Sequence, residues 1–349
     1  MVPATLPPYG DRMDEPQRRI DAVAAESGFS GVVRLERDGV VEVDAAYGLA
    51  DRAHQVPMTT ATRLGIASGS KTMTALVVLR LVEDGRLDLS TTARSVLGSD
   101  LPLIADDVTL EHLLAHRSGI GDYLDEDELD PDDYPMPVSV HRLAATEDFL
   151  PILGGYPTKF PAGERFSYCN GGYVVLALVA ERVSGRSYHD LVRELVLAPA
   201  GMTDSGFLRS DDLPGTAATG YLEVDGHWRT NVFHLPVLAT GDGGMFTTSG
   251  DVSRFWRALF DGAIVGPETL ATMLRDRSPS DPDEGRGYGL GCWVRPDSRE
   301  IALTGSDAGV SFASQHDPEL RYTHTVIANT SNGAWPVSRE LDAIVGLTP

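Results

Sequence analysis

The chain has 349 residues and a formal net charge of −22, with 29 Lys and Arg against 51 Asp and Glu. Apolar residues make up 42% of it and charged residues 23%, which is typical of a globular protein with a large core and excludes disordered and collagen-like chains. The acidic balance argues against nucleic acid or an anionic membrane surface as a partner, because both require a basic face.

The N-terminal region predicts a helix followed by a β-hairpin. Residues 11–27 carry apolar positions at helical spacing and end at Gly28. Two β-rich runs within residues 31–48 flank Asp38 and Gly39, a dipeptide typical of tight hairpin turns. This region lacks the basic stretch and apolar run of a secretory signal, so we expect a cytoplasmic protein, although a signal removed before residue 1 would leave the same pattern.

The middle of the chain reads as helical and its C-terminal part as strands. Helices are predicted over residues 71–84, 108–116, 171–184 and 187–197. Short strands are predicted over 288–294, 300–305, 309–316 and 322–330, followed by a helix over 337–347. Short sequential strands with tight turns favour an antiparallel sheet.

These elements predict an α/β (α+β) fold, in which an antiparallel sheet is flanked by helices and carries an all-helical insertion domain. Residues 1–67 and 240–349 would form the discontinuous sheet domain, and residues 68–239 the mainly helical one, with the active site between them. No apolar run reaches the roughly 18 residues of a membrane span. Two cysteines, Cys169 and Cys292, form neither a disulfide framework nor a CxxC zinc pattern.

Lysine usage singles out two positions. Only Lys71 and Lys159 are lysines, and the other 27 basic residues are arginines. Lysine can lose its proton when it is desolvated and act as a base, whereas arginine cannot. Lys71 closes the run Ser68-Gly69-Ser70-Lys71 at the start of a predicted helix, where residues three apart share a face. This spacing indicates a nucleophilic Ser68 activated by Lys71.

Two further motifs complete a candidate site. Tyr168 and Asn170 stand directly before the helix predicted over 171–184; a tyrosine beside an ammonium can carry a proton, and an asparagine amide can hold both the lysine and a substrate carbonyl. Thr304, Gly305 and Ser306 follow Leu303 on a late strand, where a glycine permits close approach of a substrate and the next N–H can face an oxyanion.

The order SxxK, then YxN about a hundred residues later, then xTG resembles the serine β-lactamase and penicillin-binding-protein superfamily, in its branch of class C β-lactamases, D,D-carboxypeptidases and family VIII esterases. Supporting phrases that are similar to the family's stand at residues 64–89, 113–123, 161–185, 197–207, 241–255 and 288–291. The resemblance therefore covers most of the chain.

The resemblance implies that Ser68 is the acyl-accepting nucleophile, that Lys71 helps to deprotonate it, and that Tyr168 carries protons to the leaving group and from the deacylating water. It also implies that Asn170 orients the substrate and that the main-chain N–H groups of Ser68 and Ser306 form the oxyanion hole. The general base stays open between Lys71 and Tyr168. The family resemblance calls for no cofactor, and we expect no metal at the site.

One departure from the family pattern bears on the substrate. The position usually held by Lys or His in the third motif is Leu303, which cannot bind a substrate carboxylate. The segment 122–134 holds eight acidic residues, either as a solvated loop or as a cavity rim that repels anions. Both features favour a neutral ester or small amide as the small-molecule substrate. Asp307 or His316 are candidates to supply a polar group in place of the missing cation.

Other residues carry weaker predictions. Leu303, Tyr123 and Phe233 are candidates for the substrate pocket. His112 and His116 lie four apart, which permits a metal pair but favours a structural role for His116. The leading function is a serine hydrolase of the esterase type. Alternatives with the same site are an acyltransferase, a D-amino-acid peptidase and a β-lactamase, and one from another class is a non-catalytic binding or sensor protein. The sequence does not reveal the oligomeric state.

Overall fold

The computed structural model describes residues 9–126, 128–129, 134–281, 286–295 and 298–347. The chain begins with α1 (Tyr9–Ser27) and the hairpin of β1 (Gly31–Arg37) and β2 (Val40–Tyr47). Asp38 (φ 52°) and Gly39 (φ 76°) form the turn between them in the left-handed region that such two-residue turns require. The predicted helix and hairpin are confirmed.

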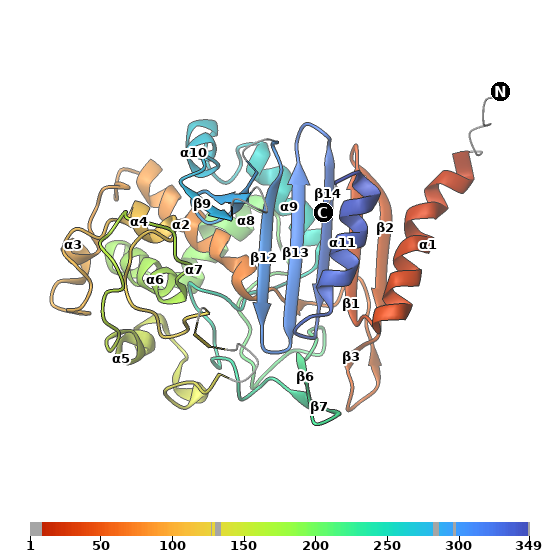
Figure 1. Ribbon diagram of the computed structural model, residues 1–349, viewed down its shortest axis with the longest axis horizontal. Helices are drawn as coiled ribbons and strands as arrows, with labels where there is room; N and C mark the ends of the chain where they lie inside the picture. The colour runs from red at the N-terminus through yellow and green to blue at the C-terminus, as the bar shows by residue number, and fades with distance from the viewer. Residues whose placement is uncertain (1–8, 127, 130–133, 282–285, 296–297, 348–349) are drawn as a thin grey trace.

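The main sheet has eight antiparallel strands in the order β2-β1-β14-β13-β12-β11-β10-β9. Its C-terminal strands are β9 (Ser278–Asp281), β10 (Arg286–Tyr288), β11 (Trp293–Val294), β12 (Ile301–Asp307), β13 (Val310–Asp317) and β14 (Tyr322–Ala328). The N-terminal strand β1 pairs with the last strand, from Gly31 opposite Ala328 to Arg37 opposite Tyr322. The two ends of the chain therefore build one sheet, as the sequence predicts (Figure 1).

The predicted strand over 288–294 is wrong. β10 ends at Tyr288 and β11 begins at Trp293, and the residues between them form the turn of a short hairpin. Packing explains the break: a side chain at Gly289 would lie 2.3 Å from the Met273 carbonyl oxygen, and one at Gly291 would lie 2.4 Å from the Ala75 side chain. The turn presses against the helices, which only two glycines permit.

Helices cover both faces of the sheet. On one face, α1 and α11 (Ala334–Val345) pack against each other and against β2, β13 and β14, around Ile20, Val33 and Leu341 (Figure 1). On the other face, α9 (Ser249–Phe260) packs against β1 and β14. Val32 and Val33 point to opposite faces and belong to the two different apolar clusters, as the two-residue period of a strand requires.

The remaining helices gather beside the sheet (Figure 1). They are α2 (Lys71–Glu83), α3 (Ala93–Leu97), α4 (Leu110–Leu114), α5 (Leu150–Leu153), α6 (Asn170–Ser184), α7 (Tyr188–Val192), α8 (Ala198–Ala200) and α10 (Pro267–Met273). α7 continues through a π-helical turn over Arg193–Leu197, which accounts for the predicted helix over 187–197. None of the helices in the described ranges combines the length and apolar character needed to cross a bilayer.

Short strands complete the fold. They are β3 (Leu49–Asp51), β4 (Val56–Pro57), β5 (Leu64–Gly65), β6 (Tyr221–Val224), β7 (His227–Thr230) and β8 (Phe246–Thr247). β5 pairs with β8 and thereby ties the segment before Ser68 to the segment that follows Asp242. The division of the chain into domains at residues 67/68 and 239/240 stays a prediction.

Candidate active site

Ser68 lies in a single 3-10 turn, Ala67–Ser70, directly before α2. Ala67 has a φ of 43°, a left-handed conformation that costs a residue with a side chain on the order of 1 kcal/mol. Two hydrogen bonds to the Ala67 carbonyl oxygen hold it there, from Ser70 Oγ at 2.7 Å and from Gly244 N at 3.1 Å. The strained turn thereby presents the Ser68 side chain to a cavity.

Lys71 is 1% exposed and lies one helical turn after Ser68. Its Nζ donates to Ser68 Oγ at 2.8 Å, to Asn170 Oδ1 at 2.7 Å and to the main-chain oxygen of Asp242 at 2.5 Å, which accounts for all three ammonium hydrogens. Burial lowers the pKa of Lys71, and the charges of nearby carboxylates oppose this shift without cancelling it. Lys71 therefore loses its proton more easily than an exposed lysine, while its Nζ is in contact with the Ser68 hydroxyl.

Tyr168 lies against the same ammonium, with its ring centroid 4.9 Å from Lys71 Nζ. Burial, followed by the charge of Glu126, raises the pKa of Tyr168 well above its ordinary value, while a hydrogen bond with Ser68 lowers it in part. The phenol therefore keeps its proton at neutral pH. The ring of His116 lies against that of Tyr168, tilted by 32° with 4.2 Å between the centroids, and its Nδ1 accepts from Cys169 N at 3.0 Å, so it supports the tyrosine.

Asn170 is the first residue of α6. The carboxyl group of Asp122 accepts from the main-chain N–H groups of Asn170 at 2.5 Å and Gly171 at 2.8 Å, and so caps this helix. The Asn170 Nδ2 donates to Leu124 O and to Glu126 Oε1, both at 2.9 Å. Both amide hydrogens are thus engaged, and the expected contact with a substrate carbonyl requires Glu126 or Leu124 to give way.

The end of β12 lies directly against the turn that carries Ser68. A side chain at Gly305 would lie 2.2 Å from Ile66 O and 3.0 Å from Ser68 N, so glycine is required there. In the described part of the chain, β11 covers this edge of β12 only at Ile301 and Ala302. The edge beyond is open, and Ser306 on it lines the same cavity as Ser68. Thr304 and Gly305 support this edge from outside the lining.

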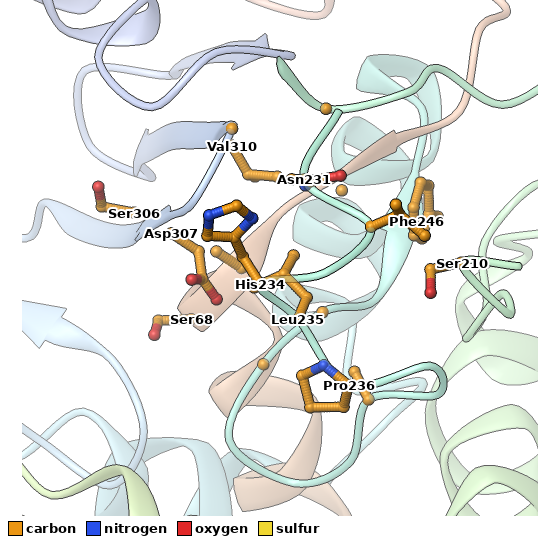
Figure 2. Close-up of a pocket in the computed structure, with 18 of the residues that line it drawn as sticks. Ser68, Ser210, Asn231, His234, Leu235, Pro236, Phe246, Ser306, Asp307 and Val310 are labelled. Carbon is orange, nitrogen blue, oxygen red and sulfur yellow. The ribbon is translucent and has the colours of Figure 1, made fainter. Parts of the chain in front are cut away.

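The cavity has a volume of about 280 Å³ and brings several predicted residues together: Ser68, Tyr123, Asn170 and Ser306. Figure 2 shows the Ser68 hydroxyl and the Asp307 carboxyl at one end of this space, and Phe246 and Ser210 at the other. Among the described lining residues, three carry carboxylates: Glu126, Asp242 and Asp307. The cavity wall is therefore mainly apolar with an acidic region at the nucleophile.

Two predicted pocket residues are placed elsewhere. Leu303 is 3% exposed and belongs to the main apolar core, because it shares with Gly305 the face of β12 that packs against the helices. Phe233 is 82% exposed and borders a neighbouring surface groove, outside the cavity that holds Ser68. Tyr123 lines the cavity, and its hydroxyl donates to the carboxyl of Asp242.

The acidic side chains at the cavity were predicted from the sequence only in part. Asp242 stands in the phrase at 241–255 that was used for the resemblance, but no role was assigned to it. Glu126 belongs to the acidic segment 122–134, of which residues 127 and 130–133 lie outside the described residues. Asp307 is at the cavity as suggested, whereas His316 stacks on Trp256 and lies outside the lining.

The structure also shows the surroundings of the residues that could hold a metal ion or act as another nucleophile. His112 Nδ1 accepts from Thr109 N in a capping box, at 3.3 Å. Within the described ranges, no group of three or more His, Cys, Asp or Glu is arranged to hold a metal ion. The Cys169 thiol is buried and accepts from Gly172 N, and burial raises its pKa well above the ordinary value, which leaves it a poor nucleophile.

Comparison with known proteins adds to this geometry. The sequence matches the family described as Beta-lactamase over residues 17–347. It is 31% identical over 336 residues to esterase EstB of Burkholderia gladioli, covering 83% of this chain and 82% of that one. It is 28% identical over 284 residues to penicillin-binding protein PbpX of Bacillus subtilis, covering 80% of this chain and 66% of that one. A crystal structure of a penicillin-binding protein from Bacillus halodurans superposes with a TM-score of 0.88 at 34% identity, covering 93% and 99%.

Proposed function

This chain belongs to the beta-lactamase family of serine hydrolases, and we propose that it forms an acyl-enzyme on Ser68 from an ester or small amide that carries no carboxylate. The observation that carries the proposal is the 2.8 Å hydrogen bond between Lys71 Nζ and Ser68 Oγ, at a lysine whose pKa burial lowers. A desolvated amine in contact with a hydroxyl is the arrangement that nucleophilic catalysis requires.

In the acylation step, neutral Lys71 takes the hydroxyl proton as Ser68 Oγ bonds to the substrate carbonyl carbon. The developing oxyanion lies between the main-chain N–H groups of Ser68 and Ser306. Tyr168 donates its phenolic proton to the departing oxygen or nitrogen. The Lys71 ammonium, which holds the proton taken from Ser68, then reprotonates Tyr168. Because Tyr168 stays protonated at neutral pH, we assign the role of base to Lys71 and that of proton carrier to Tyr168.

Deacylation repeats these steps with water as the nucleophile. Neutral Lys71 takes up a proton of the water through Tyr168, whose phenol passes its own proton on as it receives the new one, and the Lys71 ammonium then returns a proton to the Ser68 oxygen as the acid product leaves. Asn170 holds the Lys71 ammonium through its Oδ1, and so keeps the amine directed at Ser68. The role of Asn170 is thus to position the lysine.

The charge of the cavity supports a substrate without a carboxylate. Leu303 replaces the usual cation of the third motif and is buried in the core, so it cannot contact a substrate anion. Glu126, Asp242 and Asp307 line the cavity and would repel an anionic substrate. The relative named as an esterase, at 31% identity over most of both chains, favours the ester reading.

The test compares wild type with Ser68→Ala on p-nitrophenyl butyrate and on nitrocefin, which carries a carboxylate. We expect Ser68→Ala to lower kcat/KM on the ester by at least about a thousandfold. We expect slow nitrocefin turnover by the wild type. Intact-mass analysis after rapid quenching should detect the acyl group on the wild type only.

Ser99→Ala is the matched control, since Ser99 is exposed and lies outside the cavity. Equal ester rates in Ser68→Ala and wild type would refute Ser68 as the nucleophile. Fast nitrocefin hydrolysis would refute the argument from Leu303. Stable labelling of Ser68 without turnover would move the assignment to a sensor or binding protein.

A further inference from the structure

We propose that the site is selective for substrates with an aromatic leaving group, such as aryl esters and anilides, and that this group packs against the rings of Trp293 on β11 and Phe166 before α6. This inference rests on the proposed function, because it names the group that departs when the acyl-enzyme forms on Ser68. The two residues would then determine specificity for the leaving group and not for the acyl group.

Tyr168 sets the direction in which the leaving group lies. It gives its proton to the departing atom, so this atom lies beside the phenol in the tetrahedral intermediate. The oxyanion takes the place between the N–H groups of Ser68 and Ser306, and the acyl chain takes the direction that remains. Ser68 lines the large cavity, whereas Tyr168, Phe166 and Trp293 stand outside its lining. The cavity therefore suits the acyl group, and the leaving group lies along the rings beside Tyr168.

Three rings form an aromatic surface on the leaving-group side. The ring of Trp293 is parallel to that of Tyr168, with an angle of 2° between the planes and 6.4 Å between the centroids. The centroids of Phe166 and Trp293 are 6.1 Å apart. All three residues are partly exposed. Solvent thus reaches an aromatic surface next to the proton donor of the reaction, which favours an apolar occupant there.

Strand register brings Trp293 to the open edge of β12. Trp293 pairs with Ala302, so the two side chains share one face of the sheet. Because side chains alternate along a strand, Thr304 and Ser306 share that face, and neither is buried. Trp293 is the first residue of β11 and therefore stands where the covered part of this edge ends. A leaving group that extends from the oxyanion site along the open edge meets its ring.

The aromatic surface is held from behind. Tyr288 is 2% exposed, and its ring meets that of Trp293 at 89° with 4.9 Å between the centroids. The same ring lies 6.0 Å from that of Phe166 and 4.7 Å from that of His116. Rings that are fixed before the substrate arrives lose little conformational freedom when it binds. The surface is thus suited to select a flat group by its shape.

The basic residues that neighbour these rings in the sequence are directed elsewhere. The Cζ atom of Arg165 lies 4.2 Å from the centroid of the Phe160 ring. Arg295 Nε forms an ion pair with Glu300 at 3.1 Å. Neither guanidinium is therefore directed at the surface beside Tyr168, where the carboxylate of a departing amino acid would need one.

The other two groups near this place bind no anion either. The Lys71 ammonium donates its three hydrogens to oxygens of the protein, and Leu303 is buried in the core. An aryl group carries no charge and gains contacts with each ring. In acylation the bond from the carbonyl carbon to the aryl oxygen or nitrogen breaks with its electron pair on that atom. The Tyr168 proton is transferred to the same atom, so a phenol or an aniline departs.

The test compares two butyrate esters whose alcohols have similar acidity and of which only one is aromatic: phenyl butyrate and hexafluoroisopropyl butyrate. Both give the same butyryl-enzyme, so the ratio of their kcat/KM values reports the acylation step, in which the leaving group is still present. Initial rates are measured at pH 7.5 by titration of the released acid, and each kcat/KM is divided by the rate constant for hydrolysis by hydroxide. We expect the phenyl ester to be preferred by at least about tenfold.

Variants of the two rings locate this preference. Trp293→Leu should lower the ratio by about fivefold or more and Phe166→Leu by about threefold, whereas Trp293→Phe, which keeps a ring, should retain at least about half of it. A ratio of two substrates on one preparation does not depend on the fraction of folded protein. Trp228→Leu is the matched control, because Trp228 is 45% exposed on β7 and outside the aromatic surface. A ratio that Trp293→Leu leaves unchanged would overturn the inference.

A third ester exchanges the position of the ring. Hexafluoroisopropyl phenylacetate carries its ring in the acyl half, so Trp293→Leu should change its kcat/KM no more than that of hexafluoroisopropyl butyrate. An equally large loss on this ester and on phenyl butyrate would refute the assignment of Trp293 to the leaving group.

Binding to Ser68→Ala separates this inference from the proposed function. Calorimetry with the two intact butyrate esters measures recognition without turnover, and we expect phenyl butyrate to bind at least about fivefold more tightly. Equal binding and an equal corrected kcat/KM, with hydrolysis that depends on Ser68, would overturn the inference and leave the proposed function standing. Tighter binding of the phenyl ester by a protein that hydrolyses neither ester would support the aromatic surface and refute the proposed function.

Discussion

The two lysines of the chain occupy opposite environments. Lys71 lies in the active site, 1% exposed, with neutral oxygens as its hydrogen-bond partners. Lys159 lies on the segment before the YxN motif, with its side chain 25% exposed, and forms an ion pair with Asp125. It is thus partly buried and paired.

The pKa shifts of the two lysines are opposite. Burial lowers the pKa of Lys71, and carboxylates that lie near it without touching it do not reverse this. Burial also lowers the pKa of Lys159, but the hydrogen bond and charge of Asp125 outweigh it and raise the pKa overall. The depth of burial and the direct contact with a carboxylate together thus set the direction of the pKa shift of each lysine. The following predictions test this difference.

The largest effect is expected for Lys71→Arg. Arginine keeps the positive charge but cannot act as a base, so kcat/KM on p-nitrophenyl butyrate should fall by at least about a thousandfold. Lys159→Arg is the matched control, since arginine can pair with Asp125 as lysine does, and its activity should stay within about twofold. Activity that survives in Lys71→Arg would show that Lys71 is not the base.

Tyr168→Phe should lower kcat/KM by about a hundredfold, because the leaving group loses its proton donor. The pH profile is the more informative measurement. Since Lys71 must be neutral to act and burial lowers its pKa, the rate of wild type should rise with pH and level off below the ordinary pKa of a lysine, and the same rise should persist in Tyr168→Phe. Loss of the rise in that variant would indicate that Tyr168, as the phenolate, is the base.

Gly305→Ala should lower kcat/KM by about ten- to a hundredfold, because its methyl group would meet Ile66 O at 2.2 Å and push β12 away from Ser68. The melting temperature should also fall. Gly215→Ala is the control, since a side chain there meets nothing within 4 Å. Unchanged kinetics in Gly305→Ala would show that the oxyanion site does not depend on this close approach.

The smallest effect is expected for Lys159→Gln. Loss of the partly buried pair with Asp125 should reduce the free energy of unfolding by about 1 kcal/mol and leave kcat/KM within about twofold. Because the folded-state pKa of Lys159 is raised, the stabilisation that comes from this lysine's charge is fully present at pH values below its ordinary pKa of 10.5 and is lost as the pH rises through the raised folded-state value. Denaturant unfolding at pH 7 measures this. A large loss of activity would mean that Lys159 belongs to the site.

Much of the fold could be predicted because its signals are local. The hairpin turn at Asp38 and Gly39 and the helix after Ser70 depend on residues that are neighbours in the sequence. The strand expected over 288–294 was wrong because its glycines serve contacts with α2 and α10, which no local pattern displays. In the site, Ser68, Lys71, Tyr168 and Asn170 were found because family motifs hold them at recognisable spacings.

The sequence indicated the acidic half of the site only in part. The acidic segment that holds Glu126 and the residue Asp307 were both considered, but Asp242 was not, and only the folded chain brings the three to one cavity. Leu303 was expected at the pocket because of its place in a motif, but the alternation of β12 turns it to the core. The sequence also did not predict that the Asn170 amide group would donate a hydrogen bond to Glu126, because Glu126 lies on another loop.

The sequence by itself predicted the class of fold and proposed Ser68 and its neighbours as the site, because spacings of three residues and alternating apolar positions are properties of a continuous segment. Tertiary structure alone decided which lysine is desolvated, which carboxylates face the nucleophile and which predicted residues are turned away. Burial and charge depend on every segment packed nearby, so the electrostatic character of the cavity exists only in the folded chain.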